Sequence, residues 1–325
     1  MDPMRIKHTL ANRLVLLLLL TLIILALPAL AQRTRAGRRA APPPPQLRIH
    51  VLNIGQGDST LIVSPTGKIV LVDAGNPGNQ DQIIQKIKTF TGRQCRIDLF
   101  VASHPHADHI GSAAAVIRAC QVARVLDSKF PSTTATYERY LEAIQASGAE
   151  FVAADPGQTF DLGGRAVITV LSPIKPFFTQ SELRSGANEP NANSVVMRLD
   201  HGNFSMLFTG DAEAETEARM MAGGANLTAK VLKVGHHGSR YASSVEFLRA
   251  VSAQSATISV GNDNNYGHPS PEALRRLRDA RVRPYRTDLQ GQITITSNGS
   301  THRITTERTA TDAALFRGRR PRQPE

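Results

Sequence analysis

The stretch Ser103-His104-Pro105-His106-Ala107-Asp108-His109-Ile110-Gly111 places three histidines and one aspartate within six residues, directly after the apolar segment 97–102. Imidazole and carboxylate are ligands of borderline divalent metals, and the stretch contains no cysteine that would indicate a structural zinc. The apolar segment predicts a strand, and sites of α/β folds form at the carboxyl ends of strands. A turn leaving that strand can direct His104 and His106 to one metal position, and Asp108 and His109 to an adjacent one.

Strand and helix patterns alternate along most of the chain. The predicted strands lie at residues 47–53, 60–64, 68–73, 97–102, 122–126, 159–162, 165–171, 194–200, 203–209, 230–234, 255–260, 282–287, 292–296 and 302–305. The predicted helices lie at residues 81–90, 110–119, 134–148, 212–221, 243–251 and 271–280. Two β-rich runs, each completed by helices, predict an α/β fold of one domain, with two mixed sheets packed face to face and helices outside.

The N-terminal residues have the pattern of a secretory signal peptide. A basic start precedes the apolar run 14–27, and Ala29-Leu30-Ala31 is a small-residue cleavage signal, so we expect residues 1–31 to be removed after Ala31. An uncleaved membrane anchor is the alternative interpretation, although the run is short for a span and Pro28 breaks it. We therefore expect an exported monomer, periplasmic or extracellular, with no stable membrane span after cleavage.

The positive charge is concentrated at the two ends. Residues 1–45 contain seven Lys/Arg and one acid, and residues 317–325 contain four and one, so the ends hold most of the formal charge of +11. We expect a basic, Pro-rich tether at 32–46, a folded domain at 47–307 and a basic C-terminal tail at 308–325. The ends are candidates to bind polyanions, whereas the nearly neutral domain gives no such indication. Six arginines between residues 275 and 286 favour a solvated helix face over a nucleic-acid track.

The two cysteines, Cys95 and Cys120, each precede a predicted strand, and a helix connects these strands. Consecutive strands joined by a helix usually run parallel and side by side, which places both cysteines at the same end within disulfide reach. An oxidising compartment permits the bond. A disulfide and two buried free thiols both remain open.

Four further polar clusters follow predicted strands. Asp73 ends the strand 68–73 and is expected to orient a ligand histidine. Asp211 follows the strand 203–209 and can bridge two metals. His236-His237 follow the strand 230–234, and His268 precedes the capped helix 271–280. His268 has two open interpretations: contact with the substrate, including protonation of a leaving group, or ordering of its own loop.

These motifs resemble the metallo-β-lactamase superfamily of metallohydrolases and, within it, the hydrolase domain of ComEC-type DNA-uptake proteins. The resemblance covers residues 47–307 and is carried by five motifs: Gly55-Gln56-Gly57-Asp58-Ser59, His104-x-His106-x-Asp108-His109, Gly210-Asp211-Ala212-Glu213, His236-His237-Gly238-Ser239 and Tyr266-Gly267-His268-Pro269-x-Pro271. It implies that His104 and His106 bind a first metal. It likewise implies that Asp108, His109 and one of His236 or His237 bind a second, with Asp211 bridging the two.

One histidine of the superfamily pattern is missing before Asp211. The nearest candidate, His201, sits in a hairpin turn too far along the strand to reach the site. Pairing of the hairpin brings Asn193 beside Asp211 instead, as a weak ligand of the first metal. An amide oxygen is a harder ligand than imidazole, so the first site is expected to bind loosely or to prefer manganese over zinc.

The resemblance implies a dinuclear hydrolase in which a metal-bridging hydroxide attacks a phosphodiester, with single-stranded DNA as a candidate substrate. Asp108, Asp73 and His268 are the residues expected to serve catalysis beyond holding metal. One alternative is hydrolysis of small or cell-wall esters, such as a phosphocholine-type diester, a lactone or a β-lactam. The other is a non-catalytic nucleic-acid-binding partner in DNA uptake.

Overall fold

The computed structural model describes residues 45–184 and 188–319, which belong to one compact unit. The predicted signal peptide, the predicted tether up to residue 44 and the last six residues of the predicted tail lie outside the described residues. Within residues 45–184 and 188–319, no helix is both long and apolar enough to cross a membrane.

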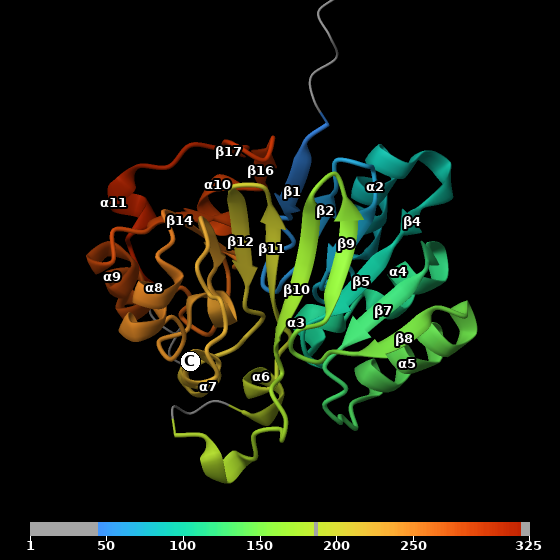
Figure 1. Ribbon diagram of the computed structural model, residues 1–325, viewed down its shortest axis with the longest axis horizontal. Coiled ribbons are helices and arrows are strands. Elements are labelled where there is room, and N and C mark those ends of the chain that lie inside the picture. The colour runs from blue at the N-terminus through green and yellow to red at the C-terminus, as the bar shows by residue number, and fades with distance from the viewer. Residues whose placement is uncertain (1–44, 185–187, 320–325) are drawn as a thin grey trace, which may run out of the picture. The chain divides into compact units, whose positions relative to one another are not determined.

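Two large sheets form the centre of the unit (Figure 1). The first contains, in spatial order, β17 (His302–Thr306), β16 (Ile293–Ser297), β1 (Leu47–Val51), β2 (Thr60–Val63), β3 (Ile69–Val72), β5 (Leu99–Ala102), β7 (Arg124–Asp127) and β8 (Glu150–Ala153). The second contains β15 (Arg283–Arg286), β14 (Ser255–Ile258), β13 (Val231–Lys233), β12 (Phe204–Phe208), β11 (Val196–His201), β10 (Ala166–Ser172) and β9 (Thr159–Gly163). Both sheets mix parallel and antiparallel pairs, as predicted.

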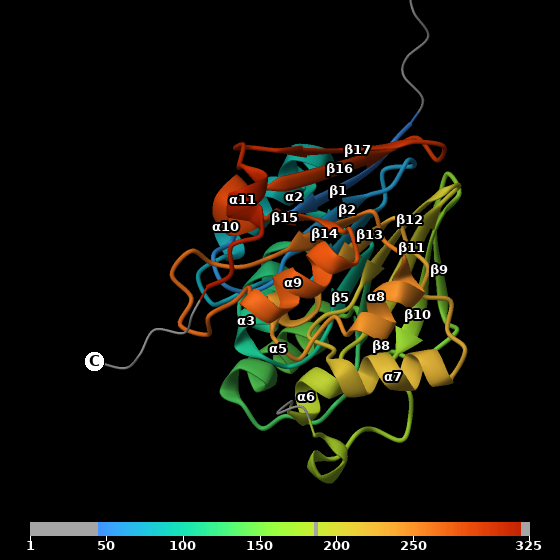
Figure 2. The ribbon, with the colours of Figure 1, turned by 90° about the vertical axis from the view of Figure 1, so that its left-hand side faces the viewer.

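Helices cover the outer faces of both sheets (Figures 1 and 2). The described helices are α2 (Gln80–Thr91), α3 (Ala107–Ile110), α4 (Ala113–Ala119), α5 (Ala135–Ser147), α6 (Glu189–Ala192), α7 (Ala214–Ala222), α8 (Val245–Val251), α9 (Pro271–Asp279), α10 (Thr287–Gln290) and α11 (Asp312–Leu315), of which α2, α4 and α5 cover the first sheet and α7, α8 and α9 the second. Short 3-10 turns occupy Gly92–Gln94, Gln180–Glu182 and Gly235–Gly238. The predicted start of α9 is confirmed, because Ser270 caps it by accepting a hydrogen bond from the Ala273 amide (3.1 Å).

Three apolar clusters hold these layers together. The central cluster contains Val70 and Val101 of the first sheet together with Met197 and Met206 of the second, so it fills the space between the sheets. A second cluster packs α2, α4 and α5 on the outer face of the first sheet, and a third packs α7, α8 and α9 on the second. Burial on both faces explains the nearly continuous apolar runs of the central strands, and the predicted sandwich is confirmed.

Two elements at the edges were not predicted. β8 pairs only with β7, and its four residues are exposed or half-buried, so its sequence Glu-Phe-Val-Ala has no strong apolar pattern. The predicted tail begins too early, because residues 311–315 form a capped helix whose Leu315 is fully buried. The arginines of this segment dominate its sequence pattern and hide the apolar pair Leu315-Phe316, so the folded domain extends beyond residue 307.

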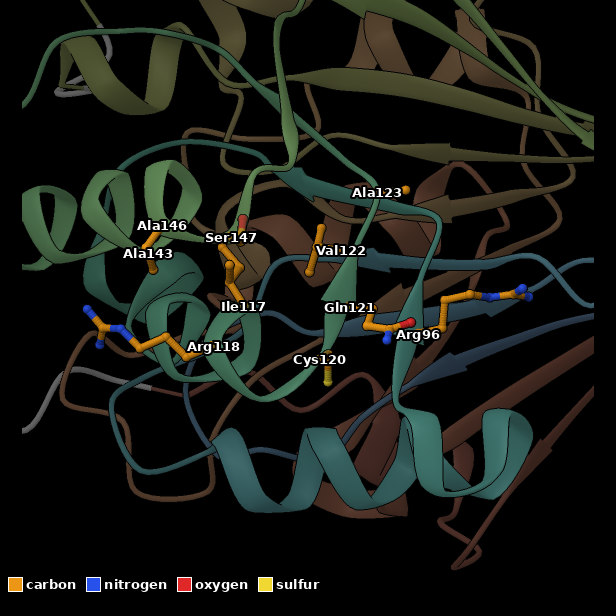
Figure 3. Close-up of a pocket in the computed structure, with 10 residues that line it drawn as sticks. All are labelled: Arg96, Ile117, Arg118, Cys120, Gln121, Val122, Ala123, Ala143, Ala146 and Ser147. Carbon is orange, nitrogen blue, oxygen red and sulfur yellow. The ribbon is translucent and has the colours of Figure 1, made fainter.

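The two cysteines form a disulfide, which resolves the alternatives left open by the sequence. Each precedes a short strand, β4 (Arg96–Ile97) or β6 (Gln121–Val122), and these strands pair in parallel as expected. Cys120 lines a cavity of about 490 Å³. Figure 3 shows it together with Arg96 and Arg118, which also line this cavity. The bond ties the connection before β5 to the one before β7, at the end of β5 opposite the histidine stretch.

The arginine-rich stretch is not a solvated helix face throughout. Arg276 donates hydrogen bonds to three carbonyl oxygens, those of Arg240, Ala242 and Ser243. Arg286 is 1% exposed and is the largest of the fully buried side chains. Arg276 and Arg286 therefore hold segments of the fold together, so the predicted solvated helix face does not describe these two residues.

Candidate metal centre

The predicted site residues meet where strands of the two sheets end. The histidine stretch follows β5 and Asp73 follows β3, and these two strands are parallel neighbours. Asp211 follows β12, and the His236-His237 turn follows β13, which is again its parallel neighbour. Carboxyl ends of parallel strands lie at one edge, so residues more than 100 positions apart in sequence converge there.

Asp211 lies at the centre of four imidazoles. Its Oδ2 atom is 3.3 Å from His109 Nε2 and 3.6 Å from His237 Nε2. The same oxygen is 3.8 Å from the Nε2 atoms of both His104 and His236. Asp211 is 2% exposed and its other oxygen, Oδ1, has no hydrogen-bond partner among the described residues. A buried carboxylate with an unpaired oxygen among imidazoles is a suitable bridge between two cations.

Two groups of ligand atoms flank Asp211. On one side, His104 Nε2 and His106 Nδ1 face each other at 3.0 Å. On the other, Asp108 Oδ2 lies 3.2 Å from His237 Nε2 and 3.9 Å from His109 Nε2. Donor atoms of Asp108, His109, Asp211 and His237 all lie within 4.8 Å of one another. The division of the histidine stretch into two adjacent groups agrees with the prediction, and ligation itself remains a prediction.

The outer nitrogens of three histidines are held by buried oxygen atoms. His109 Nδ1 donates to Asp73 Oδ2 (2.8 Å), and His237 Nδ1 donates to the Ser259 carbonyl (2.9 Å). His236 Nδ1 donates to Glu213 Oε1 (2.7 Å), which also accepts from Ser239 Oγ (2.8 Å). With Nδ1 engaged, each ring presents Nε2 toward Asp211, which is how outer partners orient metal-binding histidines. Asp73 therefore contacts a predicted ligand histidine, and its role in orienting a metal ligand stays a prediction.

The Gly55–Ser59 motif packs against the backbone of Asp108 in the same centre. Gly57 has φ +119°, and a Cβ atom there would overlap the Asp108 carbonyl oxygen. The Asp58 amide donates to that same carbonyl (3.0 Å). Asp58 Oδ2 pairs with Lys233 Nζ at 2.5 Å, and both side chains are buried. The motif therefore shapes a turn that fixes Asp108, and Asp58 lies next to the predicted ligands His109 and His237, 3.8 Å and 3.6 Å from their Nδ1 atoms.

The buried carboxylates of the centre are stabilised by positive charge, as the pKa shifts of its residues indicate. Burial alone would raise the pKa of Asp211, yet His109, His237 and His236 hold it well below its usual range. Burial would lower the pKa of His237, but the carboxylates of Asp211 and Asp58 raise it to about 10. Burial opposes protonation of His109 too, and Asp211, Asp108 and Asp73 raise its pKa well above normal. Divalent cations would meet this need while releasing protons, so the donor set fits the predicted metals.

A polar pocket of about 380 Å³ opens over the centre. It is lined by Gln56, Asn76, His106, Ala107, Asp108, Asn188, Asn191, Asp211, His236, His237, Tyr266 and His268. Burial and the nearby His236 and His237 lower the pKa of His268 to about 3. Its ring stacks on Tyr266 (5.8 Å between centroids), and its backbone N–H donates to Asn264 Oδ1 (3.0 Å). His268 thus lines the pocket with its ring and orders its loop with its backbone.

Asn193 is not placed to bind metal, so that expectation is wrong. Its Oδ1 accepts from the Phe178 amide (2.9 Å), and its Nδ2 donates to the carbonyls of Phe178 (3.0 Å) and Glu189 (2.9 Å). These three hydrogen bonds engage both the oxygen and the nitrogen of the amide, and they hold the segment at Phe178 against the one at Glu189. Asn191, two residues earlier, faces the pocket with its amide 3.3 Å from His236 Nδ1. The short helix α6 turns the chain between them, and strand pairing alone could not reveal this.

Three supporting residues had no role predicted from the sequence: Ser103, Glu213 and Lys233. Ser103 Oγ donates to Asp73 Oδ2 (2.8 Å), and its amide donates to Asp73 Oδ1 (2.7 Å). Lys233 could have been found as a single charge within the apolar strand 231–234, where an unpaired ammonium would be costly. His201 was correctly set aside, because it lies at the far end of β11 and contacts Ser297 (3.2 Å).

Comparison with known proteins identifies the family. Residues 52–261 match the metallo-beta-lactamase superfamily. The chain belongs to this superfamily. It is 30% identical over 260 residues to the competence protein ComA of Neisseria gonorrhoeae, covering 79% of this chain and 33% of that protein. It is 29% identical over 261 residues to ComE operon protein 3 of Bacillus subtilis, covering 75% of this chain and 32% of that protein.

The chain thus spans about a third of the length of the curated relatives that it matches, and the predicted resemblance to ComEC-type proteins is confirmed. Among solved structures, the metallo-beta-lactamase fold protein YhfI of Bacillus subtilis shares the fold with a TM-score of 0.51 at 13% identity. That match covers 78% of this chain and 99% of YhfI.

Proposed function

We propose that this chain is an exported, dinuclear metal-dependent hydrolase of phosphodiesters, with single-stranded DNA as its candidate substrate. One observation carries the proposal: two groups of ligand atoms share Asp211 at the floor of a polar pocket. Zinc and manganese both suit an imidazole and carboxylate site. Two bound cations would activate water and stabilise charge on a phosphoryl group.

The residues of the chain divide the remaining tasks. His104 and His106 would hold one cation, and Asp108, His109 and His237 the other, with Asp211 between them. His236 also approaches Asp211 and takes its orientation from Glu213, so it is placed to supply the imidazole that Asn193 cannot. Asp73 holds His109 in place, and the ring of His268 is placed to contact the substrate.

The lining of the pocket favours a phosphodiester over an apolar ester. The lining includes the amides of Gln56, Asn76, Asn188 and Asn191 together with imidazoles, and Ala107 and Tyr266 supply the apolar contacts. Amide N–H groups are hydrogen-bond donors to phosphoryl oxygens, whereas binding of an aromatic or aliphatic acyl group requires an apolar wall. The relative named as a competence protein, ComA, is consistent with a nucleic-acid substrate.

The basic ends of the chain are proposed to bind the polyanion non-specifically. They comprise residues 32–44 and 320–325, which contain four and two arginines. Arg319 does not belong to this group, because its guanidinium pairs with Asp288 at 2.8 Å. Binding through the ends would depend on salt and not on the metal. We further propose that the protein is a monomer of the periplasm or the cell exterior.

The proposal is tested with purified residues 32–325 in Mn²⁺ or Zn²⁺, against single-stranded DNA, bis-p-nitrophenyl phosphate and nitrocefin. Asp108→Ala removes a ligand, and Asp81→Ala, on the exposed first turn of α2, is the matched control. We expect metal-dependent phosphodiester cleavage that is lost only in Asp108→Ala. Turnover of nitrocefin instead would establish the ester alternative. Binding of DNA without cleavage, abolished by deleting residues 32–44 and 320–325, would establish the non-catalytic one.

A further inference from the structure

The C-terminal segment 311–319 is anchored on the outer side of the second sheet (Figure 2). Thr311 caps α11, Leu315 is fully buried, and Phe316 packs against the apolar cluster formed by α7, α8 and α9. Arg278 lies over the Phe316 ring, 4.8 Å from its centroid. These contacts hold the segment as part of the domain and fix the direction in which the chain continues.

A buried arginine holds the end of this segment. Arg286 Nη1 donates to the carbonyls of Arg317 (2.7 Å), Leu315 (3.2 Å) and Ala314 (3.4 Å). Its Nη2 pairs with Asp288 Oδ2 at 2.7 Å, and the Asp288 side chain is fully buried. One guanidinium therefore satisfies the last carbonyls of α11 and also neutralises a buried carboxylate.

Arg319 connects this anchor to the loop 261–268. Its Nη2 atom contacts both Asp288 Oδ2 (2.8 Å) and Asn262 Oδ1 (2.7 Å), and its Nη1 donates to the Asn262 carbonyl. Its backbone N–H donates to the Pro269 carbonyl (2.9 Å). Arg319 thus touches the residue after His268 and a residue near the start of the loop, while its own side chain is held by Asp288.

The loop 261–268 carries two of the pocket residues. Asn264 closes it, because Nδ2 donates to the carbonyls of Gly261 (2.9 Å) and His268 (2.8 Å). Tyr266 at its tip is 65% exposed, although it stacks on His268 beside the metal centre. Pro269 lies against Gly238 of the His236-His237 turn, and the Ser270 amide donates to the Gly238 carbonyl (2.8 Å). Contacts to Asn262 and Pro269 therefore brace the loop at both ends.

We infer that Arg319 is a positioning residue of the substrate pocket: the C-terminal segment acts as a strap that fixes the loop bearing Tyr266 and His268. The inference rests on the proposed function, since it assigns a role at the same pocket. A rigid loop presents these two rings to the substrate in one orientation, whereas a released loop must be ordered on binding. The loss is therefore expected mainly in KM.

The chain contains no tryptophan, so Tyr266→Trp introduces a single fluorescent reporter at the loop tip. In that background, Arg319→Ala is compared with Arg317→Ala, which alters an exposed arginine whose side chain makes no hydrogen bond or ion pair with the described residues. We expect lower fluorescence anisotropy and stronger acrylamide quenching of the reporter indole in Arg319→Ala alone. Arg319→Lys should resemble Arg319→Ala, because an ammonium cannot reproduce the fork that joins Asp288 to Asn262.

Kinetics are measured with Tyr266 in place, on bis-p-nitrophenyl phosphate with Mn²⁺. We expect Arg319→Ala to raise KM about tenfold with unchanged metal content, and Arg317→Ala to match the parent protein. Equal mobility of the reporter indole in the Arg319 and Arg317 variants would overturn the inference, whether or not the protein hydrolyses phosphodiesters. If Arg319→Ala does not fold, Asn262→Ala replaces it, and unchanged mobility of the reporter there has the same meaning.

Discussion

Asp73 Oδ2 lies 2.8 Å from His109 Nδ1, and Asp73 reaches this position with a left-handed backbone conformation (φ +58°). Aspartate tolerates that conformation better than most residues. The carboxylate lies at the end of the neighbouring strand β5, where it also accepts hydrogen bonds from the amide and hydroxyl of Ser103. Through this pair, a residue that does not line the pocket holds the ring of His109, a predicted ligand.

Replacing Asp73 should therefore weaken metal binding while the ligands remain present. We expect Asp73→Ala to lower the affinity for Mn²⁺ or Zn²⁺ about 10- to 100-fold, because His109 loses the acceptor that fixes its ring. Titration calorimetry measures the effect. Asp155→Ala, which removes a half-exposed partner of Lys175, is the control. Equal affinities of the two variants would contradict the orienting role.

Replacing Gly57 by alanine should reduce activity far more than the same replacement at a glycine of similar conformation elsewhere. Gly57 and Gly78 have φ +119° and +100°, but of these two only Gly57 would place a Cβ atom in collision, with the Asp108 carbonyl. We expect Gly57→Ala to reduce kcat/KM about 100-fold by displacing Asp108, a shift of the order of 1 Å being sufficient. Gly78→Ala should cost only the backbone strain, and similar activity losses in the two would count against this explanation.

Replacing Asn193 should lower the stability of the protein, whereas replacing Asn191 should lower its activity. Asn193→Ala removes three buried hydrogen bonds, so we expect a loss of about 2–3 kcal/mol in the free energy of unfolding. Asn191→Ala should leave the melting temperature almost unchanged and lower kcat/KM, because its amide faces the pocket. Denaturant unfolding and steady-state kinetics measure both effects, and the reverse result would restore Asn193 as the ligand.

The disulfide should contribute to stability by restricting the unfolded chain. Cys95 and Cys120 are 25 residues apart, a loop for which chain entropy gives about 2–4 kcal/mol. We expect Cys95→Ser with Cys120→Ser to lower the melting temperature and to remove its sensitivity to dithiothreitol. A parent protein whose melting temperature does not respond to reductant would show that the bond is absent or without effect.

His50 should make the protein less stable in mild acid. Burial, together with Lys86 and Arg48, lowers the pKa of His50 from 6.5 to about 4 in the folded state. The unfolded chain binds the proton more readily, so this contribution to stability is complete above pH 6.5 and is lost as the pH falls toward 4. The pKa difference corresponds to at most about 3 kcal/mol.

The variant His50→Gln can still hydrogen-bond Thr294 Oγ1, which lies 3.1 Å from His50 Nδ1, but it cannot take up a proton in this range. Its melting temperature should fall less than that of the parent between about pH 7 and pH 4.5, the range in which the histidine titrates. Thermal unfolding across this range is the measurement, and two parallel profiles would rule out His50 as the source.

Much of the sandwich was predictable because its strands are buried on both faces. The segments 69–72 and 99–102 consist entirely of apolar residues, so their pattern survives without any knowledge of their partners. The edges were less predictable. β8 is half-exposed, so its sequence lacks a strong apolar pattern. The helix at 312–315 lies in an arginine-rich segment, and this segment is held by contacts with residues distant in sequence, such as the bond from Arg286 to the Arg317 carbonyl.

The sequence by itself determined the kind of site: the histidine stretch, Asp211 and the His236-His237 turn carry their chemistry in their residue types and in their places after strands. Only the tertiary structure decided how these groups are held, since hydrogen bonds across the sheets are not encoded in local spacing. The tertiary structure shows that the amide facing the pocket belongs to Asn191 and not to Asn193. It also shows the partners of Asp73, Glu213 and Lys233. It also turned a supposed basic tail into a strap on the pocket loop, because the contacts of Arg319 depend on residues more than 30 positions away.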